Sequence, residues 1–219
     1  MEAFAAIDQR LQQGGGHVLC LGAHCDDIDI GAGGALLTWL NRWPDTRVTW
    51  VALTSNDERA AELRESASLF LAEAGRFEVL TQTFRNGFFP TEFNGIKAFF
   101  ESLKALPNPD LILTHQRDDR HQDHRTVCDL TWNTFRNHCV LEYEIAKFDG
   151  ELERPNAFVA LSEDIMQRKI DILMQCYRSQ LDKQWFDEDL FRGLARLRGV
   201  ECASPTRFAE AFVARKLLL

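Results

Sequence analysis

Two polar clusters in the sequence contain the residue types that bind metal ions and move protons. The first is His24-Cys25-Asp26-Asp27, which directly follows an apolar run at residues 18–23. The second spans residues 115–124, contains three histidines and three aspartates, and follows a strand-like run at 110–114. Open α/β sheets place their chemistry at the carboxyl ends of strands, so both clusters are expected at one edge of a sheet. Together they indicate one metal site.

The chemistry that these residues favour is hydrolysis. A catalytic zinc ion needs three ligands from histidine and carboxylate, and leaves one position for a water whose pKa falls to roughly 7. His24, Asp27 and one histidine of the second cluster can supply these ligands. Asp26 can then accept a proton from the water. Since His121 and His124 are three residues apart at a predicted loop-to-helix junction, one can bind metal while the other faces the substrate.

The elements that must position these residues alternate along the chain. Apolar runs alternate with amphipathic segments, which is typical of βαβ units and predicts an α/β protein with a mainly parallel sheet flanked by helices. The 219 residues, 45% of them hydrophobic, predict a single domain. Strands are predicted at 17–23, 47–53, 77–80, 111–113 and from 139, and helices at 31–40, 55–74, 96–106, from 122, at 162–180 and at 187–198.

Local signals suggest where three of these elements begin or lie. The glycines of residues 31–34 are expected to open a helix and to let it pack closely beneath the metal loop. Ser55 and Glu58 have the spacing of a capping box at the start of the next helix. Residues 208–212 are expected to form an edge strand or a last helix turn.

Composition excludes several classes of function. A net charge of -8 without a basic stripe argues against a nucleic-acid partner. No window approaches the roughly 18 apolar residues of a membrane span, and residues 1–8 lack the basic and apolar segments of an export signal. We therefore expect a cytoplasmic protein with a small-molecule substrate, for which homo-oligomerisation stays open.

The two clusters carry a resemblance to a known family. The chain resembles the LmbE-like superfamily of zinc deacetylases, which includes the N-acetylglucosaminyl-phosphatidylinositol (PIG-L) de-N-acetylases. The family signature Ala-His-Pro-Asp-Asp reads Ala23-His24-Cys25-Asp26-Asp27 here, and His-Pro-Asp-His reads His121-Gln122-Asp123-His124. Both prolines are replaced, but no ligand or acid-base group is lost. Weaker matches at Arg64-Glu65, at 177–180 and at 209–212 extend the resemblance over nearly the whole chain.

The resemblance implies a fold, a cofactor and a reaction. The fold would be Rossmann-like, with residues 1–219 forming one LmbE-like deacetylase domain. His24, Asp27 and His124 would bind zinc, with Fe²⁺ as the alternative ion. The reaction would be hydrolysis of the N-acetyl group of a small sugar or sugar conjugate, such as one used in polysaccharide or glycoconjugate metabolism, with release of acetate.

The resemblance also implies roles for the remaining site residues. Asp26 would be the general base, and His121 would steady the oxyanion or protonate the leaving amine. Arg64 and Asn86 correspond to polar positions that hold the sugar in this family. From the sequence alone, Arg64 is equally well explained by an ion pair on a helix surface. Asp123 is explained by a solvated helix turn or by a contact that orients a ligand histidine.

Three other functions compete with the deacetylase. The competitor from another class is a catalytically silent module that binds a metal or a sugar. A cysteine hydrolase that uses Cys25 as its nucleophile would leave Asp26 and Asp27 without a task. A nicotinamide cofactor is disfavoured because residues 31–34 lack the GxGxxG pattern. The six scattered cysteines contain no CxxC pair, which argues against a disulfide framework or a thiolate zinc site.

Overall fold

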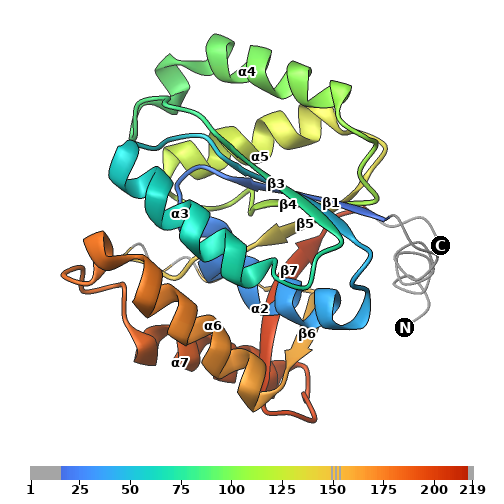
Figure 1. Cartoon of the computed structure of the whole chain (residues 1–219), viewed down its shortest axis with the longest axis vertical. Helices are drawn as coiled ribbons and strands as arrows, with labels where there is room; N and C mark the ends of the chain where they lie inside the picture. Colours follow the sequence, from blue (N-terminus) through green and yellow to red (C-terminus); the bar gives the residue numbers. More distant parts are fainter. Residues whose placement is uncertain (1–15, 149, 151, 153, 217–219) are drawn as a thin grey trace.

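The computed structural model describes residues 16–148, 150, 152 and 154–216, and its centre is a seven-stranded sheet in the order β3-β2-β1-β4-β5-β7-β6 (Figure 1). The strands are β1 (His17–Gly22), β2 (Arg47–Ala52), β3 (Arg76–Thr81), β4 (Leu111–His115), β5 (Cys139–Tyr143), β6 (Ala157–Leu161) and β7 (Phe208–Ala214). The first five pair in parallel, and β7 runs antiparallel to both of its neighbours. This arrangement confirms the predicted α/β fold with a mainly parallel sheet.

Helices cover both faces of the sheet. They are α2 (Asp27–Arg42), α3 (Asp57–Phe70), α4 (Phe93–Ser102), α5 (Gln122–Thr134), α6 (Glu163–Cys176) and α7 (Glu188–Glu201), with short 3₁₀ turns η1 (Phe89–Thr91), η2 (Leu103–Ala105) and η3 (Arg178–Gln180). Helices α4 and α5 lie on one face, and α2, α3, α6 and α7 lie on the other (Figure 1). One hydrophobic cluster therefore lies between the sheet and each of these two layers of helices.

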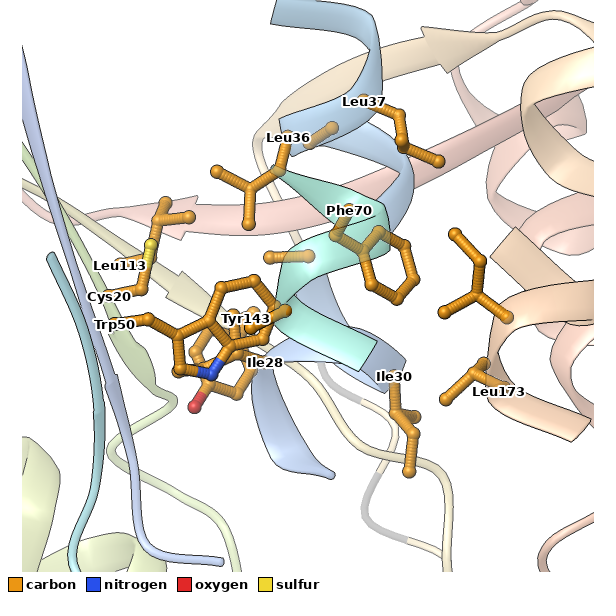
Figure 2. Close-up of a cluster of buried hydrophobic side chains, with 14 of the residues drawn as sticks. Cys20, Ile28, Ile30, Leu36, Leu37, Trp50, Phe70, Leu113, Tyr143 and Leu173 are labelled. Atoms are coloured by element: carbon orange, nitrogen blue, oxygen red, sulfur yellow. The ribbon is translucent and has the colours of Figure 1, made fainter. Parts of the chain in front are cut away.

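Strand β1 shows how the sequence builds both clusters. Val18 and Cys20 belong to the cluster beneath α2, whereas Leu19 and Leu21 belong to the cluster beneath α4 and α5. Successive side chains of a strand point to opposite faces, so a strand covered on both faces reads as a continuous apolar run. Figure 2 shows the first of these clusters, with Cys20 and aromatic side chains of the sheet beside the apolar side chains of α2.

Helix α2 differs from its prediction in where it begins. It starts at Asp27, so the glycines of residues 31–34 lie inside the helix and do not open it. A Cβ atom at Gly31 would lie 2.3 Å from Cδ2 of Tyr143, and one at Gly33 would lie 2.7 Å from Cε1 of Phe70. The glycines therefore permit close packing, as expected, but along the body of the helix.

Two further predictions were wrong in detail. Asn56, and not Ser55, caps α3, because its side-chain oxygen accepts the Arg59 N–H at 2.8 Å while Ser55 Oγ donates to the Gln82 carbonyl. Strand β7 is not an edge strand, since it pairs with β5 on one side and β6 on the other. Strand β6, which the sequence analysis did not predict, forms that edge of the sheet.

Two expectations concerned membranes and export. No helix within the described ranges has the length and apolar character needed to cross a membrane. Residues 1–8, where the sequence has no export pattern, lie outside the described residues.

Candidate active site

The site lies where two neighbouring parallel strands end and two helices begin. Strand β1 ends at Gly22 before α2, and β4 ends at His115 before α5. Because β1 and β4 pair in parallel, their carboxyl ends share one edge of the sheet. The two polar clusters therefore meet, as the sequence analysis expected.

The structure brings His24, Asp27 and His124 together. Nδ1 of His24 lies 3.1 Å from Nε2 of His124 and 3.3 Å from Oδ2 of Asp27, and His124 Nε2 lies 3.5 Å from Asp27 Oδ1. Two ligands bound to zinc at about 2.0–2.1 Å in a tetrahedron are roughly 3.3–3.4 Å apart. The three side chains therefore lie close enough to share one divalent cation, with Oδ2 of Asp27 nearest to His24 and Oδ1 nearest to His124.

Two more histidines border this triad. One set of donor atoms within 4.8 Å of one another comes from His24, His121 and His124, and another comes from Asp27, His115 and His124. His115 Nε2 lies 3.0 Å from Asp27 Oδ2, and its ring stacks on that of His124 with centroids 3.8 Å apart. His115 lies in the second polar cluster of the sequence, but no role was predicted for it. Its position as the last residue of β4 was the available signal.

Asp119 fixes the orientation of His124. Its Oδ2 lies 2.8 Å from His124 Nδ1 and accepts a bond from Lys147 Nζ at 2.9 Å. Burial alone would raise the pKa of Asp119, but the hydrogen bond with His124 and the nearby positive charges hold it below its usual value. A carboxylate on Nδ1 leaves Nε2 of His124 facing the cluster as an electron-pair donor.

Asp26 is placed differently from its neighbour Asp27. Its Oδ1 pairs with Arg59 Nη2 at 3.0 Å, whereas its Oδ2 is buried and has no hydrogen-bond partner among the described residues. Burial raises the pKa of Asp26, and the positive charge of Arg59 opposes that rise. A carboxylate with one oxygen held and a raised pKa suits a general base.

A loop that follows β3 covers His24. Asn86 Oδ1 lies 3.1 Å from His24 Nε2, and Asp123 Oδ2 lies 3.6 Å from the same nitrogen. Asp123 also accepts backbone N–H groups from Gly87 at 2.6 Å and from Phe89 at 3.1 Å. Asp123 therefore ties this loop to the start of α5 beside the candidate ligands.

The two arginines of α3 lie in different surroundings. Arg64, which the sequence analysis selected for the sugar, is exposed. Arg59, which it did not select, contacts Asp26. In the sequence, Arg59 could have been singled out only by its spacing of three residues from Glu62. Glu62 is buried, and it accepts the Nη1–H of Arg59 at 2.8 Å.

The site stabilises positive charge between its carboxylates. Burial lowers the pKa of His24, but Asp27 and Asp123 raise it more, to about 10. His121 behaves in the opposite way, because burial and the charge of His124 lower its pKa to about 4. His115 Nδ1 is buried without a partner in the described part of the chain. The carboxylates around His24 favour a positive charge at this position, which a cation held by His24, Asp27 and His124 would supply.

Cys25 points away from the cluster. Its thiol donates to the Thr54 carbonyl at 3.4 Å, and burial raises its pKa to about 12. A nucleophilic cysteine needs a thiolate, which a lowered pKa supplies. The environment of Cys25 therefore disfavours both the cysteine hydrolase and a reactive thiol at this position.

Comparison with solved structures shows similar folds. An N,N'-diacetylchitobiose deacetylase from Pyrococcus horikoshii is 19% identical with a TM-score of 0.70, and the match covers 99% of this chain and 90% of that one. A teicoplanin deacetylase in a zinc-inhibited form is 13% identical with a TM-score of 0.67, covering 90% and 96%. The 4-carboxy-2-hydroxymuconate hydratase GalB from Pseudomonas putida is 15% identical with a TM-score of 0.70, covering 93% and 98%.

These identities show the fold alone, and that fold is shared by deacetylases and a hydratase. The search of curated proteins found no match. A family model described as PIG-L, GlcNAc-PI de-N-acetylase, matches residues 19–135, which include both polar clusters and more than half of the 219 residues. The chain therefore belongs to the PIG-L family.

Proposed function

We propose that the protein is a metal-dependent hydrolase that removes the N-acetyl group from a small sugar or sugar conjugate in the cytoplasm. This proposal rests on the positions of His24, Asp27 and His124, whose nearest side-chain nitrogen and oxygen atoms lie within 3.5 Å of one another. Next to Asp27 in the chain, Asp26 has a buried Oδ2 with no hydrogen-bond partner among the described residues. Membership of the PIG-L family and the two deacetylases among the similar structures support the reaction.

His24, Asp27 and His124 would hold the divalent ion, for which zinc is our first choice and Fe²⁺ the alternative. When bound, such an ion lowers the pKa of a water molecule and polarises the carbonyl of the amide. Asp119 keeps His124 in the tautomer that can serve as a ligand, and Nε2 of His115, which accepts the Ala23 N–H at 3.0 Å, lies beside Oδ2 of Asp27. These contacts orient the ligands before the substrate arrives.

Asp26 would move the proton. Its Oδ1 is held by Arg59, so Oδ2 is the oxygen that accepts a proton from the attacking water. The same carboxyl group can then give that proton to the nitrogen of the amine as the C–N bond breaks. The second proton of the water leaves the new carboxyl group and is taken up by the amine, so the products are acetate and a protonated amine. Burial raises the pKa of Asp26 toward the pH at which the enzyme works. The carboxylate therefore takes up a proton more readily and can still release it to the amine.

His121 would stabilise the developing negative charge on the amide oxygen. Its Nδ1 accepts the backbone N–H of Asp123 at 3.2 Å, so a neutral ring carries its hydrogen on Nε2. Its lowered pKa keeps the ring neutral near pH 7. Of the two roles expected from the sequence, this state favours an N–H donor to the oxyanion over an acid for the leaving amine.

Two polar residues are proposed to contact the sugar. Asn86 is exposed, and its Oδ1 lies 3.1 Å from Nε2 of the candidate ligand His24. Arg64 is exposed on α3 and stays a proposed contact on the basis of the family resemblance alone.

The test is a panel of N-acetyl hexosamines, N,N'-diacetylchitobiose, and nucleotide-linked and lipid-linked N-acetyl sugars, assayed for acetate release. Purified protein should contain about one divalent ion per chain. Activity should vanish on chelation and return with added Zn²⁺ or Fe²⁺. Because one similar deacetylase is described in a zinc-inhibited form, the titration should extend to excess zinc. No acetate from any sugar with a metal-loaded protein would contradict the proposal.

The similar hydratase favours a second candidate, in which the same site adds water to a carbon–carbon double bond. That reaction would consume a conjugated substrate, so loss of its ultraviolet absorbance without acetate release would identify it. A catalytically silent module would bind a sugar and give neither signal. The proton-accepting geometry of Asp26 favours an enzyme over that module.

A further inference from the structure

A short segment far from both motifs contacts the residues behind Asp26. It follows α6 and contains Tyr177 and Ser179, the latter within η3. The backbone N–H of Ser179 donates to Glu62 Oε1 at 2.8 Å, and its hydroxyl donates to Glu62 Oε2 at 2.8 Å. Glu62 lies on α3 and is 117 residues away in the sequence. Both oxygens of a buried glutamate are thus held by one serine.

Arg59 connects this pair to Asp26. Its Nη1 donates to Glu62 Oε2 at 2.8 Å and to Ser179 Oγ at 3.2 Å. Its Nη2 lies 3.0 Å from Asp26 Oδ1. One end of the guanidinium therefore contacts Glu62 and Ser179, while the other end contacts the candidate base.

Tyr177 contacts both Arg59 and the backbone next to Asp26. The Arg59 guanidinium lies over its ring, 5.1 Å from the ring centroid, which is a favourable cation–π distance. Its hydroxyl oxygen lies 2.7 Å from the carbonyl oxygen of Cys25, the residue before Asp26, and 2.8 Å from Oδ2 of Asp29. The segment thus contacts both the arginine and the backbone that carries the base.

An arginine needs such support to orient a carboxylate. A free arginine side chain loses rotamer entropy when it is held in one orientation, and a single ion pair with a carboxylate offsets only part of that loss. The Arg59 side chain is 16% exposed. Contacts with Glu62 and Ser179 restrict it before the reaction, so that Asp26 presents Oδ2 in one orientation.

We propose that Ser179 is a positioning residue which, through Glu62, holds Arg59 against Oδ1 of Asp26. This inference rests on the proposed function, because it takes Asp26 to be the general base. It also assigns a role in the site to a part of the chain beyond residues 19–135, the range that the family model matches.

The test compares Ser179→Ala with Ser68→Ala, since Ser68 is exposed on α3 and donates only to the local Glu65 carbonyl among its described contacts. With N,N'-diacetylchitobiose, Ser179→Ala should lower kcat about 10-fold, the low end for residues that orient a site group. KM and metal content should not change. Ser179→Thr, which keeps the hydroxyl, should restore most of kcat, and Ser68→Ala should match the wild type. A raised KM with unchanged kcat would indicate a substrate contact instead and overturn the proposal.

A second measurement on metal-free protein does not depend on activity. In ¹⁵N relaxation experiments, the Nε–Hε vector of Arg59 should be ordered in the wild type and mobile in Ser179→Ala and in Glu62→Gln. The exposed Arg64 should behave alike in all three proteins. If Ser179→Ala fails to fold, Glu62→Gln provides both measurements.

The outcomes separate this inference from the proposed function. An active wild type, together with unchanged kcat and unchanged Arg59 order in both variants, would overturn the positioning role alone. A metal-loaded wild type that releases no acetate from any sugar of the panel, but whose Arg59 becomes mobile in the variants, would remove the deacetylase assignment and the role of Asp26, while the contact itself would stand.

Discussion

Helix α2 contacts two buried charged clusters, and they differ in how completely their polar atoms are paired. At the middle of the helix, Glu210 accepts N–H groups from Gly34 and Ala35 at 2.8 and 2.7 Å and pairs with Lys169 Nζ at 2.7 Å. At the start of the helix, Asp26 Oδ2 has no partner among the described residues, and two histidine nitrogens face each other at 3.1 Å.

The fully paired cluster stabilises the fold, whereas the incompletely paired cluster has polar atoms that are available for chemistry. Buried polar groups are nearly always hydrogen-bonded, so an unpaired one calls for an explanation such as an ion or a reactant. A paired cluster such as Lys169 and Glu210 connects α6 and β7 to α2. The cluster at Asp26 and Asp27 keeps acceptors available, which is what binding a cation and taking up a proton require.

The largest expected effect comes from the candidate ligands. Replacing His24, Asp27 or His124 with Ala should remove the ion and acetate release together, because each supplies one of three convergent donors. The fold should survive, since the two hydrophobic clusters do not depend on the ion. Elemental analysis and circular dichroism check both points. Full metal retention in all three variants would refute this ligand set, and loss of metal in His121→Ala would favour the set that contains His121.

Asp26→Asn should separate the base from the ligands. The amide cannot accept the proton, so activity should fall by about 10²–10⁴-fold, the usual contribution of a general base. Metal content should not change, whereas Asp27→Ala should lose the ion. An empty site in Asp26→Asn, with residual activity proportional to bound metal, would show that the roles of the two carboxylates are reversed.

Lys169→Met should show the opposite behaviour at the paired cluster. Removing one partner of a buried ion pair leaves an uncompensated charge on Glu210, so the free energy of unfolding should fall by about 3–5 kcal/mol. Metal content per folded chain should not change. The control is Lys104→Met, which breaks an exposed pair with Glu101 and should cost at most about 1 kcal/mol. Equal losses in urea unfolding would contradict the distinction between the two pairs.

The sequence predicted the fold and the main cluster because both are encoded locally. Alternating apolar and amphipathic segments predict the parallel sheet, and the histidines and aspartates follow β1 and β4 directly. Helix starts were less predictable. The glycines of residues 31–34 suggested a beginning, but Gly31 and Gly33 instead make room for the rings of Tyr143 and Phe70 on neighbouring elements, which no local pattern shows.

The supporting residues could not be predicted because they meet only after folding. Arg59 and Arg64 are both polar positions of one amphipathic helix, and the sequence does not tell which of them faces Asp26. Glu62 is one of three glutamates of that helix in the sequence, yet in the structure it is buried and hydrogen-bonded to Ser179, 117 positions away. Likewise, Asp119 is one of several loop acids in the sequence and becomes the partner of His124 only in the structure.

Gly31→Ala should test the close packing that holds α2 beneath the site. A Cβ atom there would lie 2.3 Å from the buried Tyr143 ring, and such overpacking typically costs about 1–3 kcal/mol. Gly193→Ala on α7 is the matched control, because nothing lies within 4 Å of the added atom. That variant should be stabilised by about 0.4–1 kcal/mol. Similar unfolding midpoints for both variants would show that α2 can shift without cost.

The smallest effect is expected from Cys25→Ser, although this residue lies between a candidate ligand and the candidate base. Its thiol contacts the Thr54 carbonyl, and a serine hydroxyl can donate to the same oxygen. The raised pKa of Cys25 also means that little thiolate exists near pH 7. We therefore expect Cys25→Ser to keep its metal and most of its activity, and to gain no protection against oxidation. Measurements of kcat, metal content and intact mass check this.

An inactive variant with normal metal content, combined with an acyl adduct on Cys25 of the wild type, would establish a nucleophilic cysteine. The unpaired Oδ2 of Asp26 would then need another explanation than proton transfer.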